Sequence, residues 1–228
     1  VLEVPATFDQ VRATSGRSDD EGEAALEAGL RWRLLHTVDE TARIDFQHAL
    51  MRDAVLAEMT PLRRQRLHQR AAQTLAHSDT AAATLAYHWR MAGDVAQEGR
   101  YALLAGQQAA ALGAHKDAIG YLARAVACLP PRKEKFTAWI EWVRLLQVTS
   151  QWGEAATVGQ AALTAARQAG NRWAQGRALV ELARIARMQG ENEPALRLNQ
   201  EALDHLRAVN DGLGLSLAYS GMGAIAWA

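Results

Sequence analysis

Residues 44–68, IDFQHALMRDAVLAEMTPLRRQRLH, combine side chains that could do chemistry. His48 and His68 could serve as a general base or as metal ligands, because neutral imidazole accepts a proton or a metal ion near neutral pH. The arginines beside them could hold a phosphate or a carboxylate. The stretch is therefore consistent with a catalytic cluster, with a basic patch for nucleic acid, or with a joint between two structural units.

His48 decides between the first and the last of these interpretations. If residues 43–48 form a strand, side chains alternate, so His48 shares the face of Ile44 and Phe46 and points inward. No second ligand stands at a metal-like spacing. This favours a packed histidine whose nitrogens bond the backbone or a carboxylate. We expect a joint built by Phe46, His48, Arg52, Arg63, Arg64 and His68.

Motifs for other chemistry are missing from the sequence. There is no GxxxxGK[ST] phosphate loop, GxSxG elbow, HExxH helix or dinucleotide glycine fingerprint. The single cysteine, Cys128, excludes an internal disulfide framework and any multi-cysteine metal site. The sequence thus predicts a protein that is not an enzyme, has no metal site and needs no cofactor of its own.

Charge divides the chain into two regions. Residues 1–60 hold 12 acidic and 6 basic residues, whereas residues 61–228 hold 13 acidic and 19 basic residues. This predicts a domain over 1–60, a second domain over 61–228, and a boundary near Thr60-Pro61.

The first region predicts a mixed α and β unit. A short helix over 6–16 should stop at Gly16, and a second helix over 18–33 should begin at Ser18, with acidic residues in its first turn. Residues 34–39 and 43–48 then predict a hairpin, with a turn at 40–42. Two helices followed by a hairpin are the end of a winged-helix module. Because DNA binding requires lysine and arginine, the acidic helix argues against DNA contact by this unit.

Landmark residues in the middle of the chain resemble a known family. These residues are Phe46-x-His48-x-Leu50-x-Arg52-x-Ala54, Leu62, Arg63, Arg64, Arg66-Leu67-His68, Leu85-Ala86-Tyr87-His88-Trp89 and Ala92-Gly93-Asp94. With them, the region resembles the segment that closes the winged helix in bacterial STAND-class signalling ATPases, which include MalT-like and large LuxR-type transcriptional activators.

Small residues recur in the second region at the spacing of a tetratricopeptide repeat (TPR). Ala118, Ala155 and Ala195 are 37 and 40 residues apart, and each is followed seven residues later by another alanine. Because a helix pair cannot bury its apolar face alone, such rows predict stacked helix pairs. We therefore expect a mainly α fold: an α-α superhelix, or TPR-like solenoid, preceded by a small partial winged-helix α+β unit. The matching rows in the first helices of the pairs are Trp139, Leu179 and Tyr219; Val143, Ala183 and Gly223; Leu146, Ala186 and Ala226.

Arginines recur on the surface that the first helices should form. This register predicts a concave stripe that could bind a carboxylate-rich peptide, a phosphate-bearing ligand or an acidic surface of the same protein. Solvation of an exposed helix face explains the same arginines equally well. The stripe comprises Arg100, Gln107, Arg144, Gln147, Arg177, Arg184 and Arg187.

The resemblance implies a sensor arm that binds a protein, a peptide or a small inducer and couples that event to its own NTPase domain, where ATP is expected upstream. The alternatives are a stand-alone scaffold for acidic peptides and a nucleic-acid-binding repeat. No apolar run could span a membrane, and the reduced cysteine fits the cytoplasm. We further expect a solenoid truncated at its C-terminal end, where Leu215, Leu217 and Met222 could support a homodimer.

Overall fold

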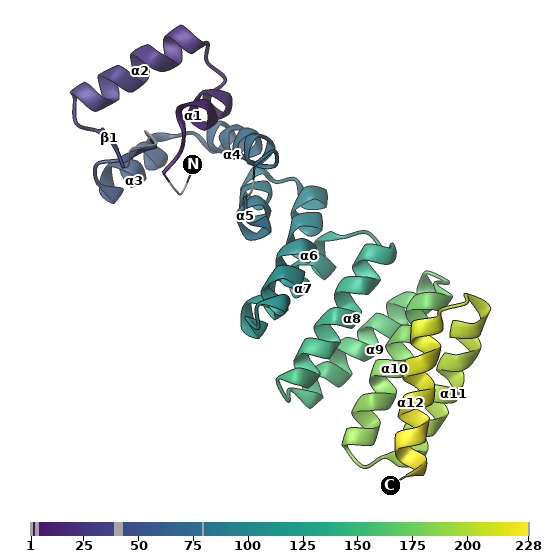
Figure 1. The fold of residues 1–228 in the computed structure, drawn as a ribbon. Helices are drawn as coiled ribbons and strands as arrows, with labels where there is room; N and C mark the ends of the chain where they lie inside the picture. The colour runs from purple at the N-terminus through teal and green to yellow at the C-terminus, as the bar shows by residue number, and fades with distance from the viewer. Residues whose placement is uncertain (1, 3–4, 39–42, 79, 228) are drawn as a thin grey trace. The chain divides into compact units, whose positions relative to one another are not determined.

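The computed structural model describes residues 2, 5–38, 43–78 and 80–227, which are mainly α-helical (Figure 1). The chain divides into two compact units, Val1–Glu98 and Gly99–Ala228. The division falls inside helix α6 (Val95–Ala111), not near Thr60-Pro61. The assignment of residues 1–60 as a separate domain stays a prediction.

The first unit begins with two capped helices. Helix α1 (Phe8–Ser15) ends at Gly16, whose φ of 69° lies in the left-handed region that favours glycine. Helix α2 (Asp19–Arg31) begins at Ser18, whose hydroxyl accepts a hydrogen bond from the Glu21 backbone N–H. Both predicted signals, the Gly16 stop and the Ser18 cap, are confirmed.

A short antiparallel hairpin follows. Strand β1 (Leu35–Thr37) pairs with β2 (Ile44–Phe46), and Ala6 forms an isolated bridge to Ile44 on the other side. The predicted turn at 40–42 lies outside the described residues. The hairpin itself is confirmed, although both strands are shorter than predicted.

The early end of β2 overturns the prediction for His48. The strand stops at Phe46, so the alternation of faces does not extend to His48. This residue is instead the exposed N-cap position of helix α3 (Ala49–Glu58), and its side chain makes no capping hydrogen bond. His48 therefore does not point inward with Ile44 and Phe46.

Two further helices follow in the first unit. Helix α4 (Pro61–Leu75) has Pro61 in its first turn, and the Thr60 hydroxyl caps it by accepting a hydrogen bond from the Arg63 N–H. It packs against helix α5 (Ala82–Ala92). Helix α4 also contacts α1, where Arg70 Nη1 donates a 2.8 Å hydrogen bond to the Ser15 carbonyl.

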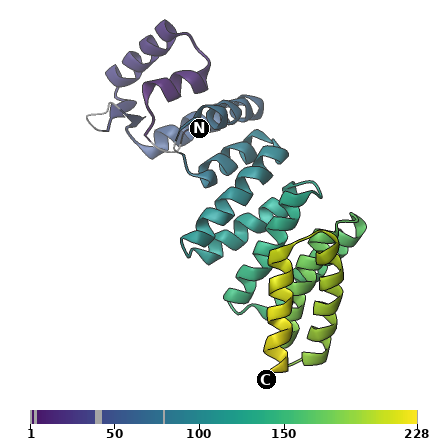
Figure 2. The same cartoon turned by 45° about the vertical axis from the view of Figure 1, so that its right-hand side comes forward.

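The second unit is a stack of antiparallel helices (Figures 1 and 2). After α6, its helices are α7 (His115–Cys128), α8 (Lys133–Val148), α9 (Trp152–Gln168), α10 (Arg172–Met188), α11 (Asn192–Ala208) and α12 (Gly212–Ala226). Each successive pair from α7 to α12 is in contact. Among the described residues, no helix is long and apolar enough to cross a membrane.

Small side chains allow these helices to nest. Ala118, Ala155 and Ala195, the predicted markers of the second helices, are each 0% exposed. A Cβ added at Gly176 would stand 2.5 Å from Leu206 Cγ, so α10 and α11 approach too closely for any larger residue there. The alanine rows therefore pack between helices, as the sequence predicted.

Curvature follows from which helices touch. The first helices of the pairs are in direct contact, since α8 and α12 both meet α10, whereas α9 and α11 are spread further apart. The layer of α8, α10 and α12 is therefore the tighter, inner side of this unit. We refer to it as the first-helix surface.

The expected homodimer surface stays a prediction. Leu215, Leu217 and Met222 are partly buried against a core cluster of α9 to α12, so only part of each side chain is open. The exposed apolar residues of α12 are Leu213 and Tyr219, with Trp227 directly after it.

Candidate recognition surface

A ladder of polar side chains crosses the first-helix surface from one repeat to the next. Gln107 on α6 donates a 2.9 Å hydrogen bond to Glu141 on α8. Burial raises the pKa of Glu141, although the hydrogen bond from Gln107 and the charge of Arg144 act in the opposite direction. Two residues of the predicted stripe, Gln107 and Arg144, thus surround a half-buried carboxyl group.

The next step of the ladder is centred on Glu181 of α10, which is 1% exposed. Arg144 Nε donates a 2.6 Å hydrogen bond to Glu181 Oε1, and Gln147 Nε2 donates a 3.1 Å hydrogen bond to Oε2. Arg184 Nη1 lies 3.9 Å from the same Oε2 atom. Because a buried carboxylate needs charged and hydrogen-bonding partners, this cluster explains much of the predicted basic stripe structurally.

Arg177 has a different role from the one predicted. It is 8% exposed and forms a two-pronged pair with Asp211, with Nε donating to Oδ2 at 2.5 Å and Nη2 to Oδ1 at 2.8 Å. Asp211 also caps α12 by accepting a hydrogen bond from the Gly214 N–H. Arg177 therefore ties α10 to the start of α12 and offers no open charge to a ligand.

The pKa of Asp211 reflects this environment. Burial alone would raise the pKa, but the hydrogen bonds from Arg177 and Gly214 and the charge of Arg177 lower it below its ordinary value. The carboxylate thus stays charged, which keeps the ion pair intact at neutral pH.

An open polar pocket lies at the end of the ladder, between α10, α11 and α12. Its volume is about 380 Å³. Arg184 and Arg187 line one side of it, Ser220 and Gly221 line the other, and Asn199 of α11 is 3% exposed beneath them. Two residues of the predicted stripe therefore face a space that a ligand could occupy.

Asn199 was not predicted as a site residue, although the sequence contains a signal for it. It stands four residues after Ala195 and three before Ala202, on the stripe of α11 that packs into the core. The signal in the sequence is therefore an asparagine on a helix face where alanines otherwise recur.

Arg100, the remaining residue of the predicted stripe, is exposed on α6, where its guanidinium carbon lies 5.9 Å from the Tyr101 ring centroid. It belongs to the second unit and takes no part in the Glu181 cluster. The structure therefore brings together Arg144, Gln147 and Arg184, and leaves Arg100 apart from them.

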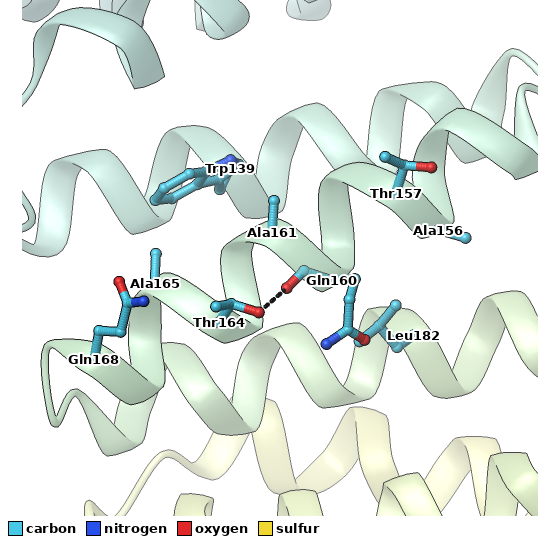
Figure 3. Close-up of a pocket in the computed structure, with 9 residues that line it drawn as sticks. All are labelled: Trp139, Ala156, Thr157, Gln160, Ala161, Thr164, Ala165, Gln168 and Leu182. Carbon is cyan, nitrogen blue, oxygen red and sulfur yellow. Dashed lines mark hydrogen bonds between the residues drawn. The ribbon is translucent and has the colours of Figure 1, made fainter.

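A second, shallower hollow of about 780 Å³ runs along α9, between α8 and α10 (Figure 3). Its lining consists of apolar and uncharged polar side chains, with Trp139 from α8 and Leu182 from α10 on either side of α9. Thr164 Oγ1 donates its hydrogen bond to the Gln160 carbonyl. The described residues that line this hollow are uncharged, so it offers apolar contact and neutral polar groups.

Trp139 belongs to the core, as the spacing of the repeats suggested. Its ring stacks on Phe136 with centroids 5.8 Å apart, and it packs against the buried clusters of α8 to α11. Trp142 and Trp152 pack against the cluster around Val143 and Leu146. The tryptophans are therefore partly buried between helices, and Trp139 also lines the hollow along α9.

The predicted joint residues separate into two groups in the first unit. Arg52, Arg64 and His68 line a small pocket of about 190 Å³ with Asp53 and Tyr87. By contrast, His48 and Arg63 are exposed, and Phe46 lines another, mostly apolar cavity of about 310 Å³.

The sharpest feature near that small pocket is a pair of buried histidines. His68 Nδ1 on α4 lies 3.0 Å from His88 Nδ1 on α5, so the N–H of one ring donates a hydrogen bond to the ring nitrogen of the other. His68 is 3% exposed and His88 0%. Burial, the neighbouring His88 and Arg64 lower the pKa of His68 to about 4.

Arg64 links α3 to α4 by donating a hydrogen bond to the Leu56 carbonyl. Arg52 pairs with the adjacent Asp53 at 3.4 Å. Within the described residues, no group of three or more His, Cys, Asp or Glu side chains could hold a metal ion. Arg64 therefore joins α3 to α4 by a side-chain hydrogen bond, and His68 and His88 join α4 to α5.

Comparison with known proteins gives similarity of structure but not of sequence. No protein-family model matches the chain, and no curated protein sequence matches it. Among solved structures, apo RapI is 8% identical with a TM-score of 0.54, over 77% of this chain and 52% of RapI. The chain thus spans about half the length of RapI.

A second structure is a Rap protein complexed with competence and sporulation factor. It is 12% identical with a TM-score of 0.51, over 96% of this chain and 68% of the Rap protein. At such low identity, these likenesses establish the architecture alone. The chain has a mainly α, TPR-like helical-repeat fold with one small two-stranded sheet.

Proposed function

We propose that this chain is a recognition arm that binds a peptide segment of a partner protein on the first-helix surface. The observation that carries the proposal is the open polar pocket beside Arg184, Arg187 and Asn199, at the end of a ladder whose other charges are already paired. The similar Rap protein complexed with competence and sporulation factor supports a binding role for such a fold.

The wider setting that we propose is a bacterial STAND-class signalling ATPase or transcriptional regulator. The order of α1, α2 and the hairpin, with the Ala6 bridge to Ile44, supports this proposal, because it is the order expected for the latter part of a winged helix. In this setting ATP binds in an upstream NTPase domain, and recognition shifts the equilibrium between states of the whole protein through the joint around Arg64 and His68. The alternative is a stand-alone scaffold that binds peptides on the same first-helix surface without a switch. A phosphate loop encoded upstream in the full-length gene would distinguish the signalling ATPase from this scaffold.

Selection of random twelve-residue peptides displayed against the 228-residue chain tests the recognition role. We expect enriched peptides to carry acidic residues and to bind more weakly as salt concentration rises, because their charges would meet arginines. Exchange of Arg187 for Gln should weaken binding. Arg197→Gln on α11 is the matched control, since Arg197 is exposed and, within the described residues, pairs with Glu193 of its own helix.

Failure to enrich any peptide over an unrelated helical protein would refute the recognition role. If the enriched peptides no longer bind to Arg197→Gln but still bind to Arg187→Gln, recognition takes place near α11 and the proposed surface is wrong.

A further inference from the structure

The pocket between α10, α11 and α12 has an imbalance of charge that points to a specific ligand group. Glu181, the nearest carboxylate on α10, already accepts hydrogen bonds from Arg144 and Gln147. Arg184 reaches it only at 3.9 Å and stays 40% exposed. Arg187 has no carboxylate within ion-pair distance among the described residues. The guanidinium groups at the pocket thus exceed the carboxylates available to them.

The base of the pocket holds the side-chain amide of Asn199. The residue as a whole is 3% exposed, and it lines the pocket beside Gly221 and Arg184. An amide offers both a donor and an acceptor, so it can bond a group that enters the pocket.

Gly221 keeps that amide accessible. A Cβ at this position of α12 would stand 3.1 Å from Asn199 Nδ2, which is closer than side chains normally pack. Ser220 and Ala224 complete the same wall with small side chains. The wall facing Asn199 therefore leaves room for a group from outside the chain.

We propose that this pocket binds a carboxylate of the partner peptide, with Arg184 and Arg187 donating to its oxygens and the Asn199 amide bonding the adjacent peptide group. Guanidinium groups match the planar geometry of a carboxylate, and Asn offers both a donor and an acceptor to a peptide bond. The nearby negative charge of Glu181 favours a singly charged group over a doubly charged phosphate. This inference deepens the proposed function and depends on it.

Titration of the ¹⁵N-labelled chain with N-acetyl-tetra-alanine tests the subsite directly. The peptide with a free C-terminal carboxylate should shift the Asn199 side-chain NH₂ signals and the Arg187 Nε–H signal in a saturable manner. Arg187→Gln should weaken this binding about tenfold, the size expected for one charge-assisted hydrogen bond. Ala224→Phe should abolish it by filling the pocket from an exposed position of α12.

Related probes identify the source of the carboxylate. The C-terminally amidated peptide should give no shift, whereas an amidated peptide with a central Glu restores the shift if side-chain carboxylates are accepted. Either carboxylate source supports the subsite. Equal shifts with the amidated tetra-alanine, tighter binding of inorganic phosphate, or shifts that survive Ala224→Phe would overturn it.

Failure of the subsite is distinguishable from failure of the proposed function. If displayed peptides bind equally well to the unmodified chain, to Arg187→Gln and to Ala224→Phe, the chain recognises peptides elsewhere and the proposed subsite is wrong. If no displayed peptide binds and tetra-alanine gives no shift, both the recognition role and the subsite are refuted.

Discussion

Arg177 and Asp211 form a buried ion pair that connects two repeats, and their energetic role can be measured. Both side chains are about one-tenth exposed. Removal of one partner from a buried pair leaves an uncompensated charge, so Arg177→Gln should lower the free energy of unfolding by about 3 kcal/mol. Urea denaturation of the purified chain measures this loss. Arg167→Gln is the control, because its pair with Glu201 is exposed and should change stability by less than about 1 kcal/mol.

The pKa of Asp211 predicts how this contribution depends on pH. Because the pKa is lower in the folded state than in the unfolded state, the unfolded chain binds more protons in acid. The stabilisation is therefore complete above the ordinary aspartate pKa and is lost as the pH falls through the folded value. Arg177→Gln should destabilise the chain less in strong acid than at pH 7, and an equal loss at both pH values would contradict the assignment.

His68 predicts a second, separate pH dependence in the first unit. Its pKa falls from 6.5 to about 4 on folding, so the folded state favours the neutral ring. Stability should be complete above pH 6.5 and should decline as the pH falls from 6.5 towards 4, because the unfolded chain then binds more protons.

Thermal denaturation of the His68→Phe variant between pH 4 and 8 checks this expectation. The variant removes the titrating ring and should flatten the decline, whereas His77→Gln, at an exposed position just after α4, should leave it unchanged. A decline that is as steep in His68→Phe as in the unmodified chain would show that His68 is not its cause.

At the scale of the helix, close approach between α10 and α11 depends on Gly176. A methyl group there would meet Leu206 Cγ at 2.5 Å and Cδ2 at 2.7 Å. Overpacking of this kind typically costs 1–3 kcal/mol, so Gly176→Ala should lower the free energy of unfolding by about 2 kcal/mol.

Gly120 provides the matched control on α7. It is also a glycine inside a helix, but a Cβ there would meet no atom within 4 Å. Gly120→Ala should therefore stabilise the chain by roughly 0.5–1 kcal/mol, because alanine restricts the unfolded chain and favours helix. If both alanines stabilise in denaturant titrations, then the helices do not nest as closely as described.

Local elements were predictable because their signals lie within a few residues of one another. Gly16 and Ser18 mark a helix end and a helix start, both in the sequence and in the structure. The error at His48 arose at a strand end, where alternation no longer applies. Periodicity predicts which face a residue occupies, but it does not say at which residue the strand stops.

Contacts between repeats were predictable in pattern but not in detail. The alanine rows predicted the nesting, because small residues at repeated spacing have one packing explanation. The partner of Arg177 lies 34 residues away at the start of α12, and the Glu181 cluster joins α8 to α10. Such pairs depend on how each helix is rotated against the next, which the spacing of arginines alone does not determine.

For the molecule as a whole, the pairing of arginines with carboxylates of the same chain also affects the expected affinity for DNA. The formal net charge is zero, and Arg144 and Arg177 are held by carboxylates of the same chain. Because DNA affinity comes largely from unpaired lysine and arginine near phosphates, the proposed partner is a peptide and not DNA.

The central claim is that the layer of α8, α10 and α12 is the surface that recognises a partner. Hydrogen–deuterium exchange of the 228-residue chain, with and without the tightest displayed peptide, measures this most directly. We predict that the peptide slows exchange in α10 and α12 around Arg184 to Met188 and Ser220 to Ala224, while α9 is unchanged. Protection confined to α9 and the hollow beside Trp139 would contradict the account.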